Sequence, residues 1–361
     1  MSIETLPILF SDVVNAIQSC DNHYAVEAQH RLNSLTKPIG SLGQLEEIAA
    51  QLYSIFSGAI PRPLHRAVYV FAADHGVTSE GVSAYPREVT AQMVLNFVSG
   101  GAAINVLARA HQAALSVVDV GVDADFEEAK GMIRAKVRRG SRNMRLEAAM
   151  SEEEMFAALQ VGVSVARAAH GRRETLVAVG EMGIGNTTAA SAIAAMLTHQ
   201  SVDALTGNGT GLDTSGRARK QQVIVETLQH HFGTNKSPDA LEVLRCVGGL
   251  EIAAMTGFIL GAASLHIAVI CDGFISTAAA AVAQAVAPAV QDYLFAGHCS
   301  EEPGHRPLLQ LIGISPILNL GMRLGEGTGA VLAMPLIESA ACLMTEMATF
   351  QSAGVSEAKQ A

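Results

Sequence analysis

Residues 176–188, Leu-Val-Ala-Val-Gly-Glu-Met-Gly-Ile-Gly-Asn-Thr-Thr, join a short apolar run to an alanine-rich segment through a glycine-rich loop. A buried strand, a tight loop and a helix that begins at once form the repeating unit of parallel α/β sheets. Three other apolar runs also end in small or acidic residues, at 67–73, 115–118 and 266–271. Helical patterns lie between them. The sequence therefore predicts an α/β fold with a doubly wound, mostly parallel, Rossmann-like sheet.

The two ends of the chain predict a smaller helical domain. Two helical patterns open the sequence, and Ser41-Leu-Gly-Gln44 before the second has the S-x-x-Q form of a capping box. Residues 57–63, Ser-Gly-Ala-Ile-Pro-Arg-Pro, are rich in helix breakers and mark a boundary. The helical pattern at 330–350 is expected to pack with the N-terminal helices. We expect a small helical domain from residues 1–63 plus 331–361, and a large α/β catalytic domain from 64–330.

Composition and charge restrict the partners. The chain is 49% hydrophobic and 16% charged, with a formal net charge of -10. Clustered Lys and Arg are needed to hold nucleic acids or anionic membranes, so neither is expected as a partner. The five cysteines are an odd number, lie far apart and form no C-x-x-C pair, which is typical of reduced thiols. With no leader pattern at the start, a cytoplasmic location is expected.

Residues 252–271 carry no formal charge and are about long enough to cross a membrane. Gly257 and Gly261 interrupt this stretch, and Glu251 and Asp272 bound it. Aromatic belts and flanking positive charge are missing. A buried helix that runs into a buried strand is therefore the prediction here, and no membrane partner is expected.

The glycine loop from Gly180 to Thr188 has the spacing of a phosphate-binding P-loop, with Asn186 in the place of the lysine. Backbone N–H groups and a helix N-terminus can still hold a phosphate. Without the cation that contacts the β and γ phosphates, a monophosphate is favoured over a triphosphate. The alternative is a strand-to-helix turn whose glycines only allow close packing.

A second glycine-rich loop, residues 207–213, is followed by Arg217, Arg219 and Lys220. Lys220 is a candidate for the positive charge that the first loop lacks. The alternative is a mobile surface loop before a basic helix start.

A third glycine-rich stretch, Gly325-Glu-Gly-Thr-Gly329, places the carboxylate of Glu326 directly before an apolar helix. Glycines permit the close approach of a ligand, and a carboxylate in a partly dry pocket has a raised pKa and can accept a proton near neutrality. The alternative is an acid that only stabilises a helix N-terminus.

Metal and hydrolase chemistry are not expected. Asp74-His-Gly76, His298 and His305 fit no standard zinc spacing, and no cysteine pair accompanies them. A Ser-His-Asp hydrolase would need a G-x-S-x-G elbow, which the sequence lacks. We predict neither a metal nor a cofactor.

Seven motifs along most of the chain, in the same order, resemble one family, the nicotinate-nucleotide:5,6-dimethylbenzimidazole phosphoribosyltransferases of cobalamin lower-ligand synthesis. The motifs lie at residues 31–43, 73–77, 80–86, 180–188, 247–252, 272–274 and 322–330. The resemblance implies a homodimer and transfer of the 5-phosphoribosyl group of nicotinate mononucleotide to 5,6-dimethylbenzimidazole or a related base. The products would be α-ribazole 5'-phosphate and nicotinate.

The resemblance also implies roles for single residues. Glu326 matches the catalytic glutamate, the general base, and Glu181 is similar to a second acid at the same site. The residues that would hold the nucleotide phosphate are Gly183, Gly185, Asn186, Thr187, Thr188, Gly209 and Lys220. Those that would line the aromatic-base pocket are Tyr85, Met93, Met182 and Leu324. The preferred base stays open, as does whether the loop from His298 to Arg306 serves its own subunit's site or the partner's.

The implied reaction needs few groups. The nicotinate of the nucleotide is already a pyridinium, so it leaves without a general acid. The incoming base attacks the opposite face, inverts β to α and loses one proton, for which one carboxylate suffices. No pyrophosphate leaves, so magnesium is not required. Two other classes stay open from the residues alone: a non-catalytic sensor of nucleoside monophosphates, and a P-loop-like ATPase.

Overall fold

The computed structural model describes residues 10–126, 131–209, 211–234 and 237–356. Over these ranges it contains a seven-stranded sheet in the order β3-β2-β1-β4-β5-β6-β7, with every neighbouring pair parallel. The strands are β1 (Arg66–Ala73), β2 (Ala114–Gly121), β3 (Met132–Arg134), β4 (Leu176–Met182), β5 (Ala268–Cys271), β6 (Leu294–His298) and β7 (Pro316–Leu318). The predicted α/β fold with a parallel sheet is confirmed.

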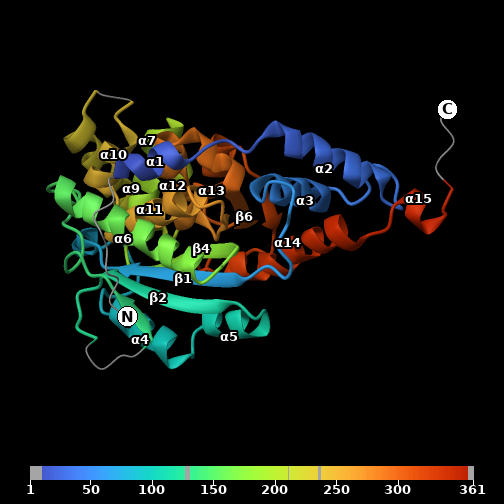
Figure 1. Ribbon diagram of the computed structural model, residues 1–361. Coiled ribbons are helices and arrows are strands. Elements are labelled where there is room, and N and C mark those ends of the chain that lie inside the picture. The colour runs from blue at the N-terminus through green and yellow to red at the C-terminus, as the bar shows by residue number, and fades with distance from the viewer. Residues whose placement is uncertain (1–9, 127–130, 210, 235–236, 357–361) are drawn as a thin grey trace.

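Helices cover both faces of this sheet, as the doubly wound prediction requires (Figure 1). The α-helices are α1 (Phe10–Ala16), α2 (Asn22–Ser34), α3 (Gln44–Ile55), α4 (Val89–Ser99), α5 (Ala103–Ala110), α6 (Glu152–Gly171), α7 (Asn186–Thr198), α8 (Val202–Leu205), α9 (Thr214–Phe232), α10 (Ala240–Val247), α11 (Leu250–Ala263), α12 (Phe274–Val286), α13 (His305–Ile312), α14 (Thr328–Glu346) and α15 (Phe350–Ala353). Two short 3-10 helices are η1 (Gly76–Glu80) and η2 (Pro288–Tyr293). Helices α6 and α11 lie on one side of the sheet in Figure 1, and α4 and α5 on the other.

The uncharged stretch at 252–271 forms most of α11 and then β5, and both elements are buried. Glycines let α11 pack closely on α6: a Cβ at Gly257 would lie 2.0 Å from the carbonyl oxygen of Leu159. The predicted buried helix and strand are confirmed. Two other helical stretches, 89–110 and 328–346, have the length and apolar composition of a membrane span. The first contains the break between α4 and α5, and over half of the second is buried inside the protein.

The N-terminal helices α2 and α3 pack against each other and against α14 (Figure 1). Arg31 donates to the carbonyl oxygen of Met347 at 2.7 Å, and Arg62 pairs with Glu338 at 3.2 Å. Because α14 also contacts β4 and β6, it joins these helices to the sheet. The division into two domains at residues 63 and 331 stays a prediction.

The predicted capping box at Ser41 is wrong. Helix α3 begins at Gln44, and its N-cap is Gly43, which has φ +54° and no side chain to accept a hydrogen bond. The carboxylate of Glu46 instead accepts the N–H of Leu42 at 3.0 Å and pairs with Lys37 at 2.8 Å. A carboxylate in the first turn thus bonds a backbone N–H that precedes the helix, which is the role that the capping box gave to the side chain of Gln44.

Candidate functional site

A cavity of about 480 Å³ lies where the carboxyl ends of β4, β5 and β6 meet. In open parallel sheets, ligands bind beyond these ends of the strands. Ten of the thirteen residues to which the resemblance gave a role line it: Tyr85, Met93, Glu181, Met182, Gly183, Asn186, Thr187, Gly209, Leu324 and Glu326. The three that do not line it are Gly185, Thr188 and Lys220. The glycine loops are therefore parts of one site, although 140 residues separate Asn186 from Glu326.

Glycines make the close approach of these loops possible. A Cβ at Gly180, near the end of β4, would lie 2.4 Å from the backbone nitrogen of Gly327. Such a distance is far below van der Waals contact, so a side chain at 180 would push the Glu326 loop away. Glu326 itself has φ +63°, an uncommon conformation for a residue with a side chain.

Glu326 lines this cavity, and the residue is only 6% exposed. Burial raises its pKa from 4.5 to about 7, the Ile104 backbone N–H lowers it, and the charge of Asp272 raises it further. Its Oε2 has no hydrogen-bond partner among the described residues. A carboxylate with these properties is half ionised near neutrality and free to accept a proton from a ligand.

Glu181, on β4, is 6% exposed and lies in the same cavity. Burial, followed by the charges of Glu251, Asp272 and Glu326, raises its pKa well above 4.5, while a hydrogen bond from the side-chain amide of Asn186 opposes this shift. Several carboxyl groups in one dry space disfavour each other's ionisation. The site therefore favours a ligand that brings positive charge.

Lys220, on α9, is completely buried next to the first glycine loop. Its Nζ donates to Oγ1 of Thr187 at 2.8 Å and would lie 3.2 Å from a Cβ at Gly209. Burial lowers its pKa to about 8, and the charge of Glu302 partly offsets this. The lysine predicted from the second loop thus contacts Thr187 and lies close to Gly209, and both of these residues line the cavity.

The first glycine loop differs from a P-loop in its hydrogen bonds. The N–H of Ile184 donates to Oγ1 of Thr90 at 3.1 Å, and the amide of Asn186 is bound to Glu181. Gly185 has φ +98° and is the N-cap of α7, and Thr188 is buried beneath the helix start. The N-terminus of α7 still faces the cavity at Thr187, although the N–H groups of Asn186 and Thr188 donate to the carbonyl oxygens of Gly183 and Gly185 at 3.1 and 3.0 Å.

Apolar side chains line another part of the cavity. Met93 and Val89 come from α4, and Met182 from the end of β4. Tyr85 and Leu324 are 54% and 55% exposed and lie at its mouth. An apolar region next to buried carboxyl groups suits a flat heterocycle with one polar edge.

Sequence reasoning assigned no role to several residues of this cavity. Asp272 follows β5, Ser300 and Glu302 follow β6, and Arg323 donates to the carbonyl oxygen of Gly209 at 3.4 Å. A signal was present for two of them, because Asp272 ends an apolar run and Arg323 lies in the motif at 322–330. Glu302 lies in the loop from His298 to Arg306, and His298 and Ser300 also line this subunit's cavity.

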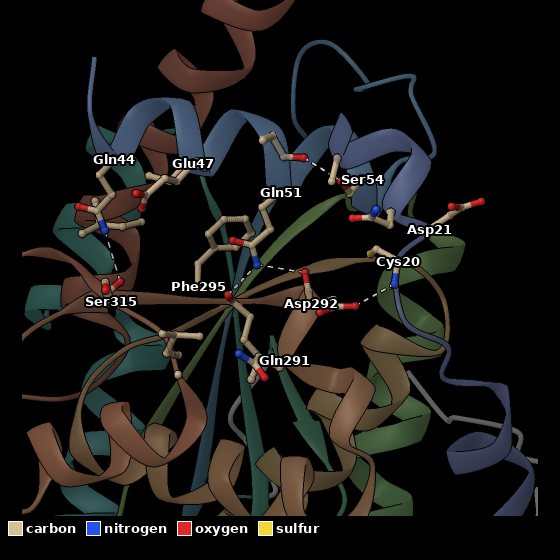
Figure 2. Close-up of a pocket in the computed structure, with 18 residues that line it drawn as sticks. Cys20, Asp21, Gln44, Glu47, Gln51, Ser54, Gln291, Asp292, Phe295 and Ser315 are labelled. Carbon is tan, nitrogen blue, oxygen red and sulfur yellow. Dashed lines mark hydrogen bonds between the residues drawn. The ribbon is translucent and has the colours of Figure 1, made fainter. Parts of the chain in front are cut away.

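A second cavity of about 460 Å³ lies between α3 and the amino end of β6 (Figure 2). There Gln51 donates to the carbonyl oxygens of Asp292 and Leu294, both at 3.0 Å, and Cys20 N–H donates to Asp292 at 2.8 Å. These contacts tie the N-terminal helices to the sheet. Ligands of open parallel sheets bind beyond the carboxyl ends of the strands, and this cavity lies at the amino end of β6. The cavity lined by Glu326 is therefore the candidate site.

Of the three histidines raised as metal ligands, two have hydrogen-bond partners, whereas neither ring nitrogen of His298 has one among the described residues, and its Nδ1 lies 3.6 Å from Oδ1 of Asp272. His75 Nε2 lies 2.5 Å from Oε1 of Glu251, and His305 contacts Thr277 and Ser300. Within the described residues, no group of three or more His, Cys, Asp or Glu side chains is arranged to hold a metal ion.

The parallel sheet, the helix N-terminus with a buried lysine and the carboxyl-lined cavity define an α/β protein built to hold a small phosphorylated ligand. Comparison with known proteins specifies the family. A phosphoribosyltransferase family model matches residues 17–355. The chain belongs to the nicotinate-nucleotide–dimethylbenzimidazole phosphoribosyltransferase family, as the sequence motifs indicated.

Individual relatives of known name are similar in sequence to this chain over nearly their whole length. The nicotinate-nucleotide–dimethylbenzimidazole phosphoribosyltransferase of Geobacter sulfurreducens is 50% identical over 349 residues, which are 97% of this chain and 99% of the relative. That of Chloroflexus aurantiacus is 48% identical over 349 residues, with the same coverage. The crystal structure of CobT from Thermus thermophilus has a TM-score of 0.88 and 46% identity, covering 93% of this chain and 100% of that one.

Proposed function

We propose that this protein transfers the 5-phosphoribosyl group of nicotinate mononucleotide to 5,6-dimethylbenzimidazole or a related base, giving α-ribazole 5'-phosphate and nicotinate. One observation carries the proposal: Glu326, whose buried Oε2 has no hydrogen-bond partner among the described residues, lines the same cavity as Thr187, which accepts a hydrogen bond from Lys220. A base for the heterocycle and a cation for the phosphate are the two groups that this transfer needs. The names of the relatives support the same substrates.

In the proposed reaction the bond between the ribose C1' and the pyridinium nitrogen breaks, and its electron pair stays on that nitrogen, which becomes neutral as nicotinate leaves. One ring nitrogen of the benzimidazole forms the new bond to C1' from the opposite face, which inverts the configuration from β to α. The other ring nitrogen loses its proton to Glu326. The pKa of about 7 suits this step, because the carboxylate is ionised near neutrality and still basic.

Glu181 would favour the positively charged sugar that develops as nicotinate leaves. Its raised pKa reflects burial among other carboxyl groups. A pyridinium and an oxocarbenium-like ribose both bring positive charge, which favours the ionised carboxylate. The Asn186 amide supports that form as well, since it donates to Glu181. Positioning of the reactants and preorganised charge of this kind can each contribute several kcal/mol.

The phosphate would lie between the N-terminus of α7 and the loop at Gly209. Thr187 lines the cavity there, and its hydroxyl oxygen accepts a hydrogen bond from Nζ of Lys220. A dianionic phosphate would keep Lys220 protonated and would exchange the Thr187 contact for a charge-assisted one. Because Asn186 is bound to Glu181 and carries no charge, we do not propose a P-loop-like ATPase.

The incoming base would occupy the apolar part of the cavity, next to Met93, Met182, Tyr85 and Leu324. Methionine side chains adapt their shape to planar ligands. We therefore propose that several bases are accepted, benzimidazoles, purines or phenolic compounds among them. A competition assay with an equimolar mixture of bases would rank them.

The test of the function is turnover. The purified protein is incubated with nicotinate mononucleotide and dimethylbenzimidazole, and α-ribazole phosphate is measured by mass spectrometry against Glu326→Gln. Wild-type product with a large loss in the variant is expected. Full activity in the variant would overturn the assignment of the base. Binding of nicotinate mononucleotide without any product would favour the non-catalytic sensor.

We also propose a cytoplasmic homodimer. The exposed apolar side chains Leu320 and Leu324, the second of which lines the cavity, support an assembly that covers them. All five cysteines are free thiols, which is typical of a reducing compartment. Light scattering coupled to gel filtration measures the oligomeric state, and a monomer at micromolar concentration would contradict the proposal.

A further inference from the structure

The carboxylate of Asp272 holds the loop that carries Glu326 through two hydrogen bonds. Asp272, in the segment between β5 and α12, is 2% exposed. Its Oδ2 accepts the N–H of Gly327 at 3.0 Å, and its Oδ1 accepts the N–H of Ala330 at 2.9 Å. Both donors belong to the start of α14, so Asp272 links β5 to the residue that follows Glu326.

The loop needs such an anchor. Gly325, Glu326 and Gly327 have φ values of +87°, +63° and +86° in succession. Holding a residue with a side chain in this region costs about 1 kcal/mol or more, and such strain persists only where the surroundings hold it. The two hydrogen bonds to a buried carboxylate supply that restraint, because bonds of this kind contribute roughly 1.5–3 kcal/mol each.

We propose that Asp272 is a positioning residue for Glu326: it holds the left-handed turn at 325–327 so that the Glu326 carboxylate lies inside the cavity. This inference rests on the proposed function, in which Glu326 is the base. Asp272 acts through its hydrogen bonds to Gly327 and Ala330 and through its charge.

The charge of Asp272 provides a readout that a purely structural role lacks. The titratable and charged residues that line the cavity with Glu326 are Tyr85 before α4, Glu181 on β4, Asp272 after β5, His298 on β6, Glu302 after β6, and Arg323 on its own segment. Asp272 is the neighbouring charge that raises the pKa of Glu326, after burial. Neutralising Asp272 therefore lowers the pKa of Glu326 and moves the acidic limb of the rate profile to lower pH.

The experiment compares four proteins: wild type, Asp272→Asn, Glu326→Gln and the double variant. We expect Asp272→Asn to lower kcat roughly 10- to 100-fold, as displacement of a catalytic group by about 1 Å does. Its Kd for nicotinate mononucleotide stays within about 3-fold of wild type, and its kcat profile shifts to lower pH. In the Glu326→Gln background the same substitution has an effect of less than about 3-fold, because it acts through Glu326.

Two outcomes would overturn the proposal. One is an equal loss of rate in both backgrounds, which would mean that Asp272 itself acts on the substrate. The other is an unshifted pH profile. Asp119→Asn is the matched control, because Asp119 is also 2% exposed, lies near the end of β2 and accepts the backbone N–H of Val122 at 2.9 Å. It should lose stability but keep kcat.

Gly327→Ala disturbs the donor of the hydrogen bond to Asp272 instead of the acceptor, so the charge of Asp272 is kept. A Cβ there would lie 2.7 Å from Cγ2 of Val68, so the turn must shift. We expect a lower kcat with an unshifted acidic limb. If Asp272→Asn does not fold, this variant still decides the question, because an unchanged kcat in Gly327→Ala overturns the proposal.

Failure of the proposed function is distinguishable from failure of this inference. If wild-type protein forms no α-ribazole phosphate, the function is wrong. The crystal structure of Asp272→Asn then tests the positioning alone. A Glu326 side chain displaced from the cavity supports the role of Asp272, and an unchanged turn at 325–327 contradicts it.

Discussion

The backbone of Gly325 lies against the carboxyl group of Glu181, so that a Cβ at position 325 would come within 2.3 Å of Oε1. This contact brings the end of β4 and the start of α14 together. It places Glu181 next to the loop of Glu326, whose charge is one of those that raise the pKa of Glu181. A glycine at 325 is therefore a condition for the two-carboxylate site.

Replacing this glycine should impair catalysis more than stability. In Gly325→Ala the new methyl group displaces the Glu181 carboxylate, and we expect kcat to fall roughly 10- to 100-fold. Gly321→Ala is the matched control, because Gly321 also has positive φ (+65°) but nothing within 4 Å of its Cβ position. Steady-state kinetics and thermal unfolding of both variants measure the difference. Equal kinetic losses in the two would show that backbone strain, not the contact with Glu181, is responsible.

The rate should depend on the ionisation of Glu326. A base accepts a proton only when ionised, and the pKa of this carboxyl group is raised to about 7 by burial. We therefore expect kcat to decrease as the pH falls below about 7, by close to tenfold per pH unit. Initial rates measured from mildly acidic to mildly alkaline pH test this. A profile that stays flat down to about two pH units below the pKa would exclude Glu326 as the base.

The same shift affects stability. The folded state holds the Glu326 proton more tightly than the unfolded chain, so between pH 4.5 and about 7 folding takes up a proton and stability decreases as the pH rises. In Glu326→Gln this loss is absent. The variant should gain up to roughly 3 kcal/mol over wild type above pH 7, and the gain should vanish below pH 4.5. Urea unfolding on either side of this pH window measures the difference.

Lys220 should contribute to binding the phosphate of nicotinate mononucleotide and not to binding the incoming heterocycle. Lys220→Met keeps the length of a buried side chain but removes its charge, and we expect the KM for nicotinate mononucleotide to rise roughly 10- to 100-fold. Nicotinate riboside, which lacks the phosphate, is the control substrate and should be affected less than about 3-fold. In wild type the KM should also increase above pH 8, because the pKa of Lys220 is about 8. Equal effects on both substrates would contradict this role.

The local pattern of apolar residues was sufficient to predict the long strands. The runs at 67–73 and 176–179 lie within β1 and β4, because a strand buried on both faces needs an uninterrupted apolar segment. The run at 266–271 begins two residues too early, since β5 starts at Ala268. Strands β3 and β7 have three residues each and no such pattern. Their place at the two edges of the sheet depends on pairing with neighbours far away in the chain.

The sequence by itself determined the α/β class, the strand-end loops that carry the site, and the family, because apolar runs and glycine motifs are local features of the chain. Only the tertiary structure decided how those loops meet. It directed the Asn186 amide to Glu181, placed Lys220 behind Thr187, and set Asp272 beneath the turn of Glu326. The reason is physical: partners in a dry cavity are selected by distance and burial after folding. Neither the five positions between Glu181 and Asn186 nor the 55 between Asp272 and Gly327 carry a local signal of that contact.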